Sequence, residues 1–201
     1  MIIVNLNIRG LGGGTKARYL SHLVTKEGVE FLCLQETKTS SFSDSDAFYY
    51  GEVVTLGGST MKGSMGAGSM ITMWNKEAFE YGIRVAGTGF IVIVGYHLEA
   101  KRHCVVVNVY SACNIQDKIH LWEALTTLKQ SHQNLAWYLC GDFNAVRRSE
   151  ERKGIRGHSS QKKEIVGFNN FIETNGWMDI PCVGKKVYLV QSKWHNKEQI
   201  R

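Results

Sequence analysis

Short apolar runs alternate with stretches of helical periodicity along the chain, and this alternation limits its fold more than any other feature of the sequence. The pattern is typical of an α/β domain, in which helices cover the sheet that the neighbouring strands build. Strands are predicted where β-branched and aromatic residues concentrate, at residues 1–7, 29–35, 68–75, 88–98, 103–110 and 136–142. The run at 29–35 is nearly continuous in apolar residues, which indicates a sheet that helices cover on one side.

Three helices are predicted from apolar residues at helical spacing, at residues 15–26, 116–131 and 161–174. Thr15 is a suitable N-cap for the first helix, and Gly28 lies just past its end. The strands on either side of residues 99–102 are predicted to form a hairpin. The glycine- and serine-rich segment 57–68 is predicted to be a loop.

Length and composition predict one soluble domain. A chain of 201 residues, 43% of them hydrophobic, is long enough to bury a core. Its five cysteines are odd in number and form no Cys-x-x-Cys pair, so they indicate neither a disulfide framework nor a zinc site. The N-terminus lacks the features of a secretory signal, and no apolar run approaches the ~20 residues that span a bilayer. We therefore expect an intracellular protein, nuclear or cytoplasmic, without a membrane partner.

Polar residues at the ends of predicted strands are the strongest indication of chemistry. Glu36 directly follows one strand, and Asp142 ends another, two residues before Asn144. Carboxylates at strand ends in an α/β domain face the crevice where ligands bind, and Mg²⁺ prefers one or two carboxylates with water and substrate phosphate. The alternative is that both acids are ordinary strand-end residues. Their combination with Asn7 and Tyr110, at two further strand ends, favours a site.

Four motifs resemble the endonuclease/exonuclease/phosphatase superfamily, which includes apurinic/apyrimidinic endonucleases, pancreatic-type DNases and the endonuclease domains of LINE-type retrotransposons. The motifs are LNIRG at 6–10, LQETK at 34–38, VNVYS at 107–111 and GDFN at 141–144. The chain looks most similar to plant LINE-type (non-LTR) endonuclease domains. NIRGLGG at 7–13 and GDFNAVRRSEERKG at 141–154 are also similar to their sequences.

The resemblance implies a four-layer α/β sandwich of the DNase-like type, in which helices flank two packed β-sheets. It also implies hydrolysis of a phosphodiester in DNA with Mg²⁺ or Mn²⁺ and without a small-molecule cofactor. At the matching positions, Glu36 would be the metal ligand, and Asn7 would help to hold the metal site. Tyr110 would direct its hydroxyl at the scissile phosphate. Asp142 would activate the nucleophile or assist the leaving group, and Asn144 would stabilise the charged transition state.

Basic residues beside the motifs are the predicted contacts to DNA. The net charge of +6 and the pI of about 9.1 are compatible with a polyanionic partner. Arg9 and Lys38 lie within two motifs, and Arg147 and Arg148 open a basic cluster that follows a third. For that cluster a solvated loop is the alternative interpretation.

The end of the chain departs from the family pattern. Members of the superfamily end in a Ser-Asp-His segment, which residues 191–201 do not contain. His158 and His195 are predicted to be solvated loop residues and not its substitutes. We therefore expect a single domain over residues 1–201 that is incomplete at the C-terminus, lacks its last strands, exposes a sheet edge and has lowered stability. Two other hypotheses stay open: a catalytically inactive remnant that still binds nucleic acid, and a phosphatase of the same superfamily.

Overall fold

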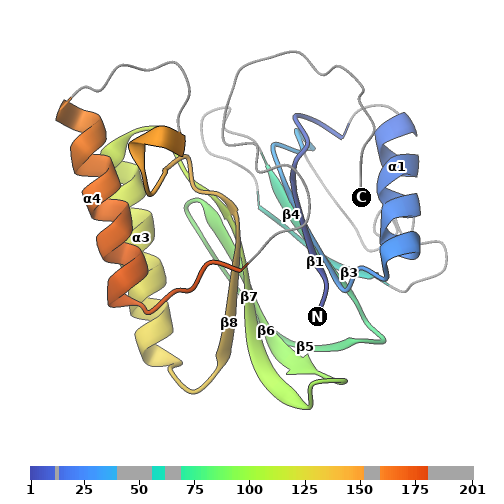
Figure 1. Ribbon diagram of the computed structural model, residues 1–201. Helices are drawn as coiled ribbons and strands as arrows, with labels where there is room; N and C mark the ends of the chain where they lie inside the picture. The colour runs from blue at the N-terminus through green and yellow to red at the C-terminus, as the bar shows by residue number, and fades with distance from the viewer. Residues whose placement is uncertain (12–13, 40–55, 62–68, 152–158, 181–201) are drawn as a thin grey trace.

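Two four-stranded β-sheets pack face to face, and helices cover the outer face of each sheet (Figure 1). The computed structural model describes residues 1–11, 14–39, 56–61, 69–151 and 159–180. The layers run from one helix through the first and second sheets to a pair of helices on the far side. This arrangement confirms the α/β sandwich that the sequence predicted.

The N-terminal part of the chain builds the first sheet and its helix. The elements are β1 (Ile3–Asn7), α1 (Gly14–Glu27), β2 (Phe31–Gln35), β3 (Leu56–Met61) and β4 (Met70–Asn75). β1 and β2 are parallel and joined by α1, whereas β4 pairs antiparallel with both β2 and β3. The strand order is therefore β1-β2-β4-β3.

The second sheet follows in the sequence, together with the two helices that cover it. The elements are β5 (Phe79–Gly87), β6 (Phe90–His97), β7 (Arg102–Tyr110), α3 (Ile115–Ser131), β8 (Ala136–Asp142), the short 3₁₀ helix η1 (Ser149–Glu151) and α4 (Ser159–Thr174). β5, β6 and β7 form an antiparallel meander, and β8 pairs in parallel with β7 after the α3 crossover. α4 lies beside α3 on the outer face (Figure 1).

Each sheet thus contains one parallel strand pair joined by a helix, and these two pairs position the candidate site. Parallel strands end at the same edge of a sheet. Asn7 is the register partner of Gln35 in the first pair, and Tyr110 is the register partner of Asp142 in the second. β1 also lies against β8 across the sandwich. The carboxyl ends of all four strands consequently meet at one end of the molecule.

Side chains along the central strands alternate between two cores, as the pleat of a strand requires. In β7, Val105 and Val107 pack toward α3 and α4, whereas Cys104 and Val106 pack against the first sheet. β2 alternates in the same way between α1 and the second sheet. The inter-sheet core therefore joins the two halves below the strand ends.

The observed strands differ from the predicted ones in two places. β3 occupies residues 56–61, so the predicted loop at 57–68 is wrong for its first residues. The segment LGGSTM has two glycines and a single β-branched residue, Thr60, so its composition does not indicate a strand, and the strand is identified by its pairing with β4. β5 was not predicted, although Phe79, Tyr81, Ile83 and Val85 alternate with polar or small residues as in a strand. Most of its side chains are exposed.

Some expectations concern residues outside the described ranges. Residues 152–158 and 181–201, which include His158, His195 and the expected site of the incomplete C-terminus, are among them. Every helix within the described ranges is too short or too polar to cross a membrane.

Candidate active site

Four polar side chains meet where the two parallel strand pairs end. Asn7 ends β1, Glu36 follows β2, Tyr110 ends β7 and Asp142 ends β8. Asn7 Nδ2 donates to Glu36 Oε1 at 2.8 Å and to Asp142 Oδ2 at 3.2 Å, so one amide bridges both carboxylates and both sheets. The Tyr110 hydroxyl donates to Glu36 Oε1 at 3.1 Å. Residues that the sequence places at four separate strand ends therefore form one hydrogen-bonded cluster.

The backbone is left-handed at four of the candidate residues, namely Arg9, Glu36, Lys38 and Asn144, and two of these belong to the carboxylate cluster and its turn. Glu36 and Asn144 adopt the left-handed conformation, with φ angles of 54° and 47°. Such a conformation costs a residue other than glycine on the order of 1–3 kcal/mol and persists only where the surroundings hold it. Here the Glu36 carbonyl accepts a hydrogen bond from Gly10 N at 2.5 Å, and Thr37 N donates to Ser69 O at 2.9 Å. Strain of this kind concentrates at functional sites, which favours both positions on grounds independent of the motifs.

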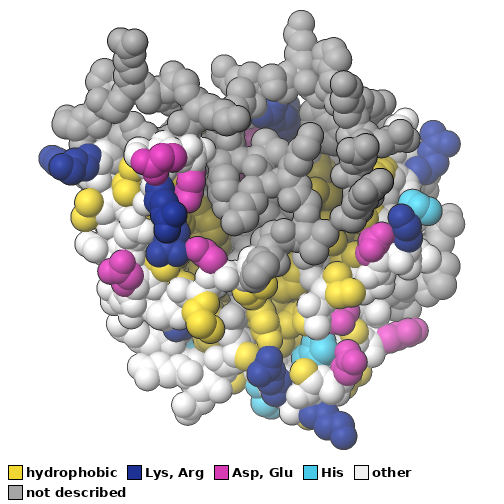
Figure 2. All heavy atoms as spheres, viewed as in Figure 1, with side chains coloured by type: hydrophobic (Ala, Val, Ile, Leu, Met, Phe, Trp, Pro, Cys, Tyr) yellow, Lys and Arg dark blue, Asp and Glu magenta, His cyan; other side chains and the backbone are white. Residues whose placement is uncertain are grey.

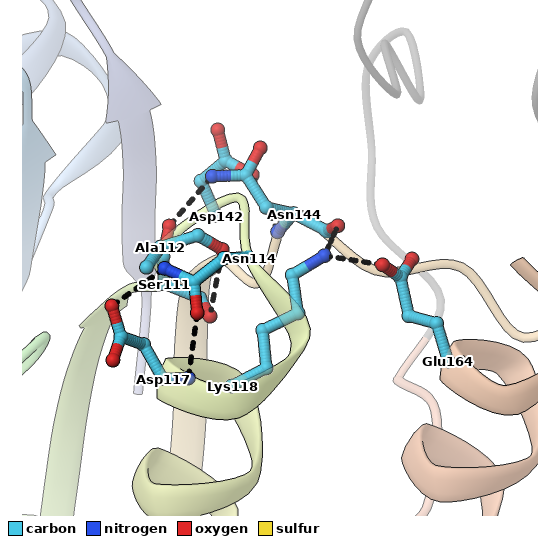
Figure 3. A network of polar contacts seen from close by, with 8 residues as sticks. All are labelled: Ser111, Ala112, Asn114, Asp117, Lys118, Asp142, Asn144 and Glu164. Atoms are coloured by element: carbon cyan, nitrogen blue, oxygen red, sulfur yellow. Dashed lines mark hydrogen bonds and ion pairs between the residues drawn. The ribbon is translucent and has the colours of Figure 1, made fainter. Parts of the chain in front are cut away.

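The turn after β8 fixes the orientation of the Asp142 carboxylate. Asn144 N donates to Asp142 Oδ1 at 3.0 Å (Figure 3). The Asn144 side chain donates to Ser111 O at 2.6 Å, and Ser111 N donates to Asp142 O at 2.8 Å, so the turn is tied to the end of β7. Because Asn7 donates to the other oxygen, both oxygens of Asp142 accept a directed hydrogen bond.

Gly141 allows β8 to approach β7 closely just before Asp142. Its φ angle is +142°, and a Cβ at this position would lie 2.0 Å from Val109 O and 2.6 Å from Val109 N. These atoms belong to the neighbouring backbone and cannot move aside as a flexible side chain would. Glycine is therefore the residue that fits at this point of the sheet.

A buried polar pair lies between the sheets beneath the site. Gln35 and Asn108 are both 0% exposed. Gln35 Nε2 donates to Asn108 Oδ1 at 2.6 Å and to Asn5 Oδ1 at 2.7 Å. Asn108 Nδ2 donates to Ile71 O at 3.0 Å and to Thr72 Oγ1 at 3.1 Å. Sequence reasoning did not assign this role, although an asparagine inside the apolar run VVVNVY signals it, because a buried amide needs partners.

Burial raises the pKa of the Tyr110 hydroxyl, and the negative charge of Glu36 together with their hydrogen bond raises it further. Tyr110 therefore remains protonated and donates to Glu36 at neutral pH.

We expect Tyr110→Phe to remove an alkaline sensitivity of the fold. An unfolded tyrosine ionises near pH ~10. Above this pH the unfolded wild-type chain releases a proton that folded Tyr110 retains. The free energy of unfolding of wild type therefore decreases relative to that of the variant, so wild type becomes less stable. Denaturant titrations of both proteins at neutral and alkaline pH measure the difference. Ultraviolet titration of the folded proteins supplies the control, because identical tyrosine ionisation is expected near pH ~10. An additional tyrosine that ionises there in folded wild type would contradict the raised pKa.

The donor set of the site fits a divalent cation. Asn7 Oδ1 is buried and has no hydrogen-bond partner among the described residues, although buried polar atoms ordinarily have one. The nitrogen of the same amide contacts carboxylate oxygens of Glu36 and Asp142, and oxygen donors of this kind suit Mg²⁺. The described residues contain no group of three His, Cys, Asp or Glu side chains placed to hold a metal ion. The oxygen donors Asn7, Glu36 and Asp142 suit Mg²⁺, whereas structural zinc sites are built from Cys and His side chains.

A cavity of about 540 Å³ lies beside the loop that carries Glu36. Its lining residues are Arg9, Gly10, Leu11, Lys16, Thr37, Lys38 and Thr39. The Lys16 ammonium donates to the carbonyls of Ile8 and Gly10, each at 2.8 Å. These bonds stabilise the backbone on either side of Arg9, which lines the cavity. Two of the predicted DNA contacts, Arg9 and Lys38, thus lie together at this cavity.

The other two predicted DNA contacts lie after β8 and differ from each other. The Arg147 guanidinium donates to Asp179 Oδ2 at 2.7 Å and to Asn169 Oδ1 at 3.1 Å, whereas Arg148 is exposed. Figure 2 shows basic and acidic side chains next to each other on the described part of the face that it presents. Arg147 therefore has partners within the protein while 36% of its side chain stays exposed, whereas Arg148 lies at the surface.

Comparison with known proteins agrees with the fold. A sequence model described as "Endonuclease/Exonuclease/phosphatase family" matches residues 4–184. Similar solved structures include AP endonuclease LMAP from Leishmania major, the human Nocturnin catalytic domain with bound sulfate, and the endonuclease domain of TRAS1, a telomere-specific non-LTR retrotransposon. Their TM-scores are 0.63, 0.60 and 0.58, at 17%, 12% and 11% sequence identity.

These alignments cover 86%, 86% and 84% of this chain and 66%, 68% and 71% of the three similar chains. At such identities the likeness shows the fold alone. No curated protein matches the sequence.

Proposed function

Since the chain belongs to the endonuclease/exonuclease/phosphatase family, we propose that it is a metal-dependent endonuclease of retroelement origin that hydrolyses phosphodiester bonds in DNA. Members of this family hydrolyse phosphodiesters or other phosphate esters. The observation that carries the proposal is the Asn7 amide bridging Glu36 and Asp142, with the Tyr110 hydroxyl on Glu36. The LINE-type motifs of the sequence support the retroelement origin.

Glu36, helped by Asn7, would hold Mg²⁺ or Mn²⁺ through oxygen atoms. The Glu36 carboxylate and Asn7 Oδ1, which has no hydrogen-bond partner in the described part of the chain, are the oxygen donors that support this assignment. When bound, such a cation supplies charge stabilisation to the phosphoryl oxygens. No small-molecule cofactor enters the proposal.

The remaining residues act on the water, the phosphate and the leaving oxygen. Asp142, fixed through both oxygens, either accepts a proton from the attacking water or delivers one to the leaving oxygen as the phosphorus–oxygen bond breaks. Tyr110, kept protonated by its surroundings, directs its hydroxyl toward the scissile phosphate. Asn144 donates to the phosphoryl oxygen that gains charge.

We propose that Arg9 and Lys38 bind DNA phosphates at the cavity beside the Glu36 loop. Arg148 contacts the backbone on the opposite side of the site. Arg147 is proposed as a further phosphate contact, and Asp179 and Asn169 orient its guanidinium. We also assign to it the ordering of the loop that carries Arg148.

Nicking of supercoiled plasmid by the purified chain tests the proposal. We expect Mg²⁺-dependent conversion to open circles that stops in chelator and returns with added Mn²⁺. The double variant Glu36→Gln/Asp142→Asn, purified in parallel, is the control for contaminating nucleases. Equal nicking by wild type and double variant would remove the support for catalysis by this chain.

Two further measurements separate the competing functions. Retention of DNA in a filter-binding assay without nicking under any metal condition would identify a nucleic-acid-binding protein that has no turnover. Release of phosphate from an inositol phosphate, again without nicking, would identify a phosphatase.

A further inference from the structure

Lys118 is a charged side chain that is almost completely buried, with 1% of the residue exposed. It lies in the first turn of α3, directly after the N-cap region formed by Asn114 and Asp117. A cation is disfavoured at this end of a helix, and a buried ammonium needs close partners. Neither the helix dipole nor apolar packing therefore explains a lysine at this position. The explanation must come from the polar contacts of its ammonium group.

The Lys118 ammonium joins three parts of the molecule. Nζ donates to the backbone carbonyl of Asn144 at 2.5 Å and to Glu164 Oε2 at 2.7 Å (Figure 3). Glu164 lies on α4 and is itself buried, with 8% of the residue exposed. Lys118 thus connects α3 and α4 to the turn that follows Asp142, and Glu164 balances its charge.

Asn144 transmits this contact to the candidate catalytic carboxylate. Its backbone is in the left-handed conformation, with φ of 47°. The Asn144 carbonyl accepts a hydrogen bond from Lys118, and the Asn144 side chain donates to Ser111 O. The Asn144 backbone N–H donates to Asp142 Oδ1. A rotation of this residue toward an unstrained conformation would redirect that N–H. The direction of the Asp142 hydrogen bond therefore depends on the donor at the Asn144 carbonyl.

We propose that Lys118, with its charge balanced by Glu164, is a positioning residue that holds Asn144 in its strained conformation and thereby orients Asp142. The effect on reaction rate rests on the proposed endonuclease function. The effect on the Asn144 turn does not.

The variants Lys118→Met and Lys118→Met/Glu164→Leu separate positioning from stability. The single variant leaves the Glu164 carboxylate buried without its ammonium, so it should lower the melting temperature. In the double variant an apolar pair replaces the ion pair, which is often neutral or stabilising, so the melting temperature should recover. The hydrogen bond from Lys118 to the Asn144 carbonyl is absent in both variants. We expect kcat for nicking to remain reduced by on the order of 100-fold, with KM within about threefold of wild type.

Lys129→Met is the matched control on the same helix. The Lys129 ammonium donates to the Asn175 carbonyl beyond the end of α4, which is the same type of contact. Eleven residues of helix separate the two lysines by roughly 16 Å. The control should lower the melting temperature without a change in kcat. Recovery of both stability and kcat in the Lys118/Glu164 double variant, or an equal loss of kcat in Lys129→Met, would overturn the proposal.

Hydrogen exchange at the Asn144 amide gives a readout that needs neither metal nor substrate. In the double variant, exchange at this amide should accelerate by at least about tenfold, while exchange at the β6 core residue Ile93 stays at the wild-type rate. Unchanged protection of Asn144 would also overturn the proposal. Absence of nicking by wild type would instead reject the endonuclease function, and the exchange measurement would still decide the role of Lys118.

Discussion

Asp142→Asn is expected to lower the rate of DNA nicking by about three orders of magnitude with the fold intact. The two Asp142 oxygens accept hydrogen bonds from Asn7 Nδ2 and Asn144 N. An asparagine at this position has nearly the same shape but cannot carry the proton, and its amide nitrogen must face one of the two donors. Loss of a positioned acid or base costs roughly 10²–10⁴-fold. Single-turnover nicking of supercoiled plasmid at saturating Mg²⁺ measures the effect.

Glu123→Gln is the matched control for this substitution. Glu123 is exposed on α3, and its variant makes the same change from carboxylate to amide. Its nicking rate should stay within about twofold of wild type, since exposed substitutions change little. A melting temperature of Asp142→Asn within a few degrees of wild type would confirm that the fold survives. A nicking rate for Asp142→Asn within tenfold of wild type would exclude Asp142 as the group that transfers the proton.

Gly141→Ala is expected to destabilise the protein by about 3 kcal/mol or more, and to lower the melting temperature by roughly 10 °C. The new Cβ would lie 2.0 Å from Val109 O, so β8 would have to move away from β7. The φ angle of +142° is also unfavourable for alanine. Because β8 carries Asp142 at its end, nicking should fall together with stability. Thermal unfolding followed by circular dichroism measures the first effect.

Gly14→Ala provides the comparison. Gly14 begins α1, and a Cβ at this position would meet no atom within 4 Å. Alanine favours helix more than glycine by about 1 kcal/mol, so this variant should melt at or slightly above the wild-type temperature. Equal melting temperatures for Gly141→Ala and wild type would show that the close approach of β8 to β7 is not required.

Local pattern predicted an α/β domain with carboxylates at strand ends, whereas the two-sheet sandwich and the roles of the candidate residues were implied by the family resemblance. Apolar runs locate the strands, and the helices between them indicate parallel pairs whose carboxyl ends coincide. Glu36 and Asp142 follow such runs, so their common location at the end of the sandwich follows from topology. The strand β8 was predicted with its observed bounds, Ala136–Asp142.

The missed features depend on partners that are distant in sequence. Lys118 has the spacing of an ordinary solvated lysine, and its burial is decided by Glu164, 46 residues later. The sequence indicates only that Arg147 is a basic residue. Its pairing with Asp179, 32 residues later, is seen only in the structure. β3 is held by backbone pairing with β4, for which its side chains give no signal. Long-range pairing of this kind leaves no periodicity in a single sequence.

The two sheets arise from consecutive pieces of the chain, since β1 to β4 span residues 3–75 and β5 to β8 span residues 79–142. Each half can pair its strands through comparatively local closures, whereas the bonds from Asn7 to Asp142 and from Gln35 to Asn108 require both halves to dock. Neither half contains both Glu36 and Asp142. The proposed active site therefore forms only when the two sheets dock, and the proposed activity should be lost as soon as the sheets separate.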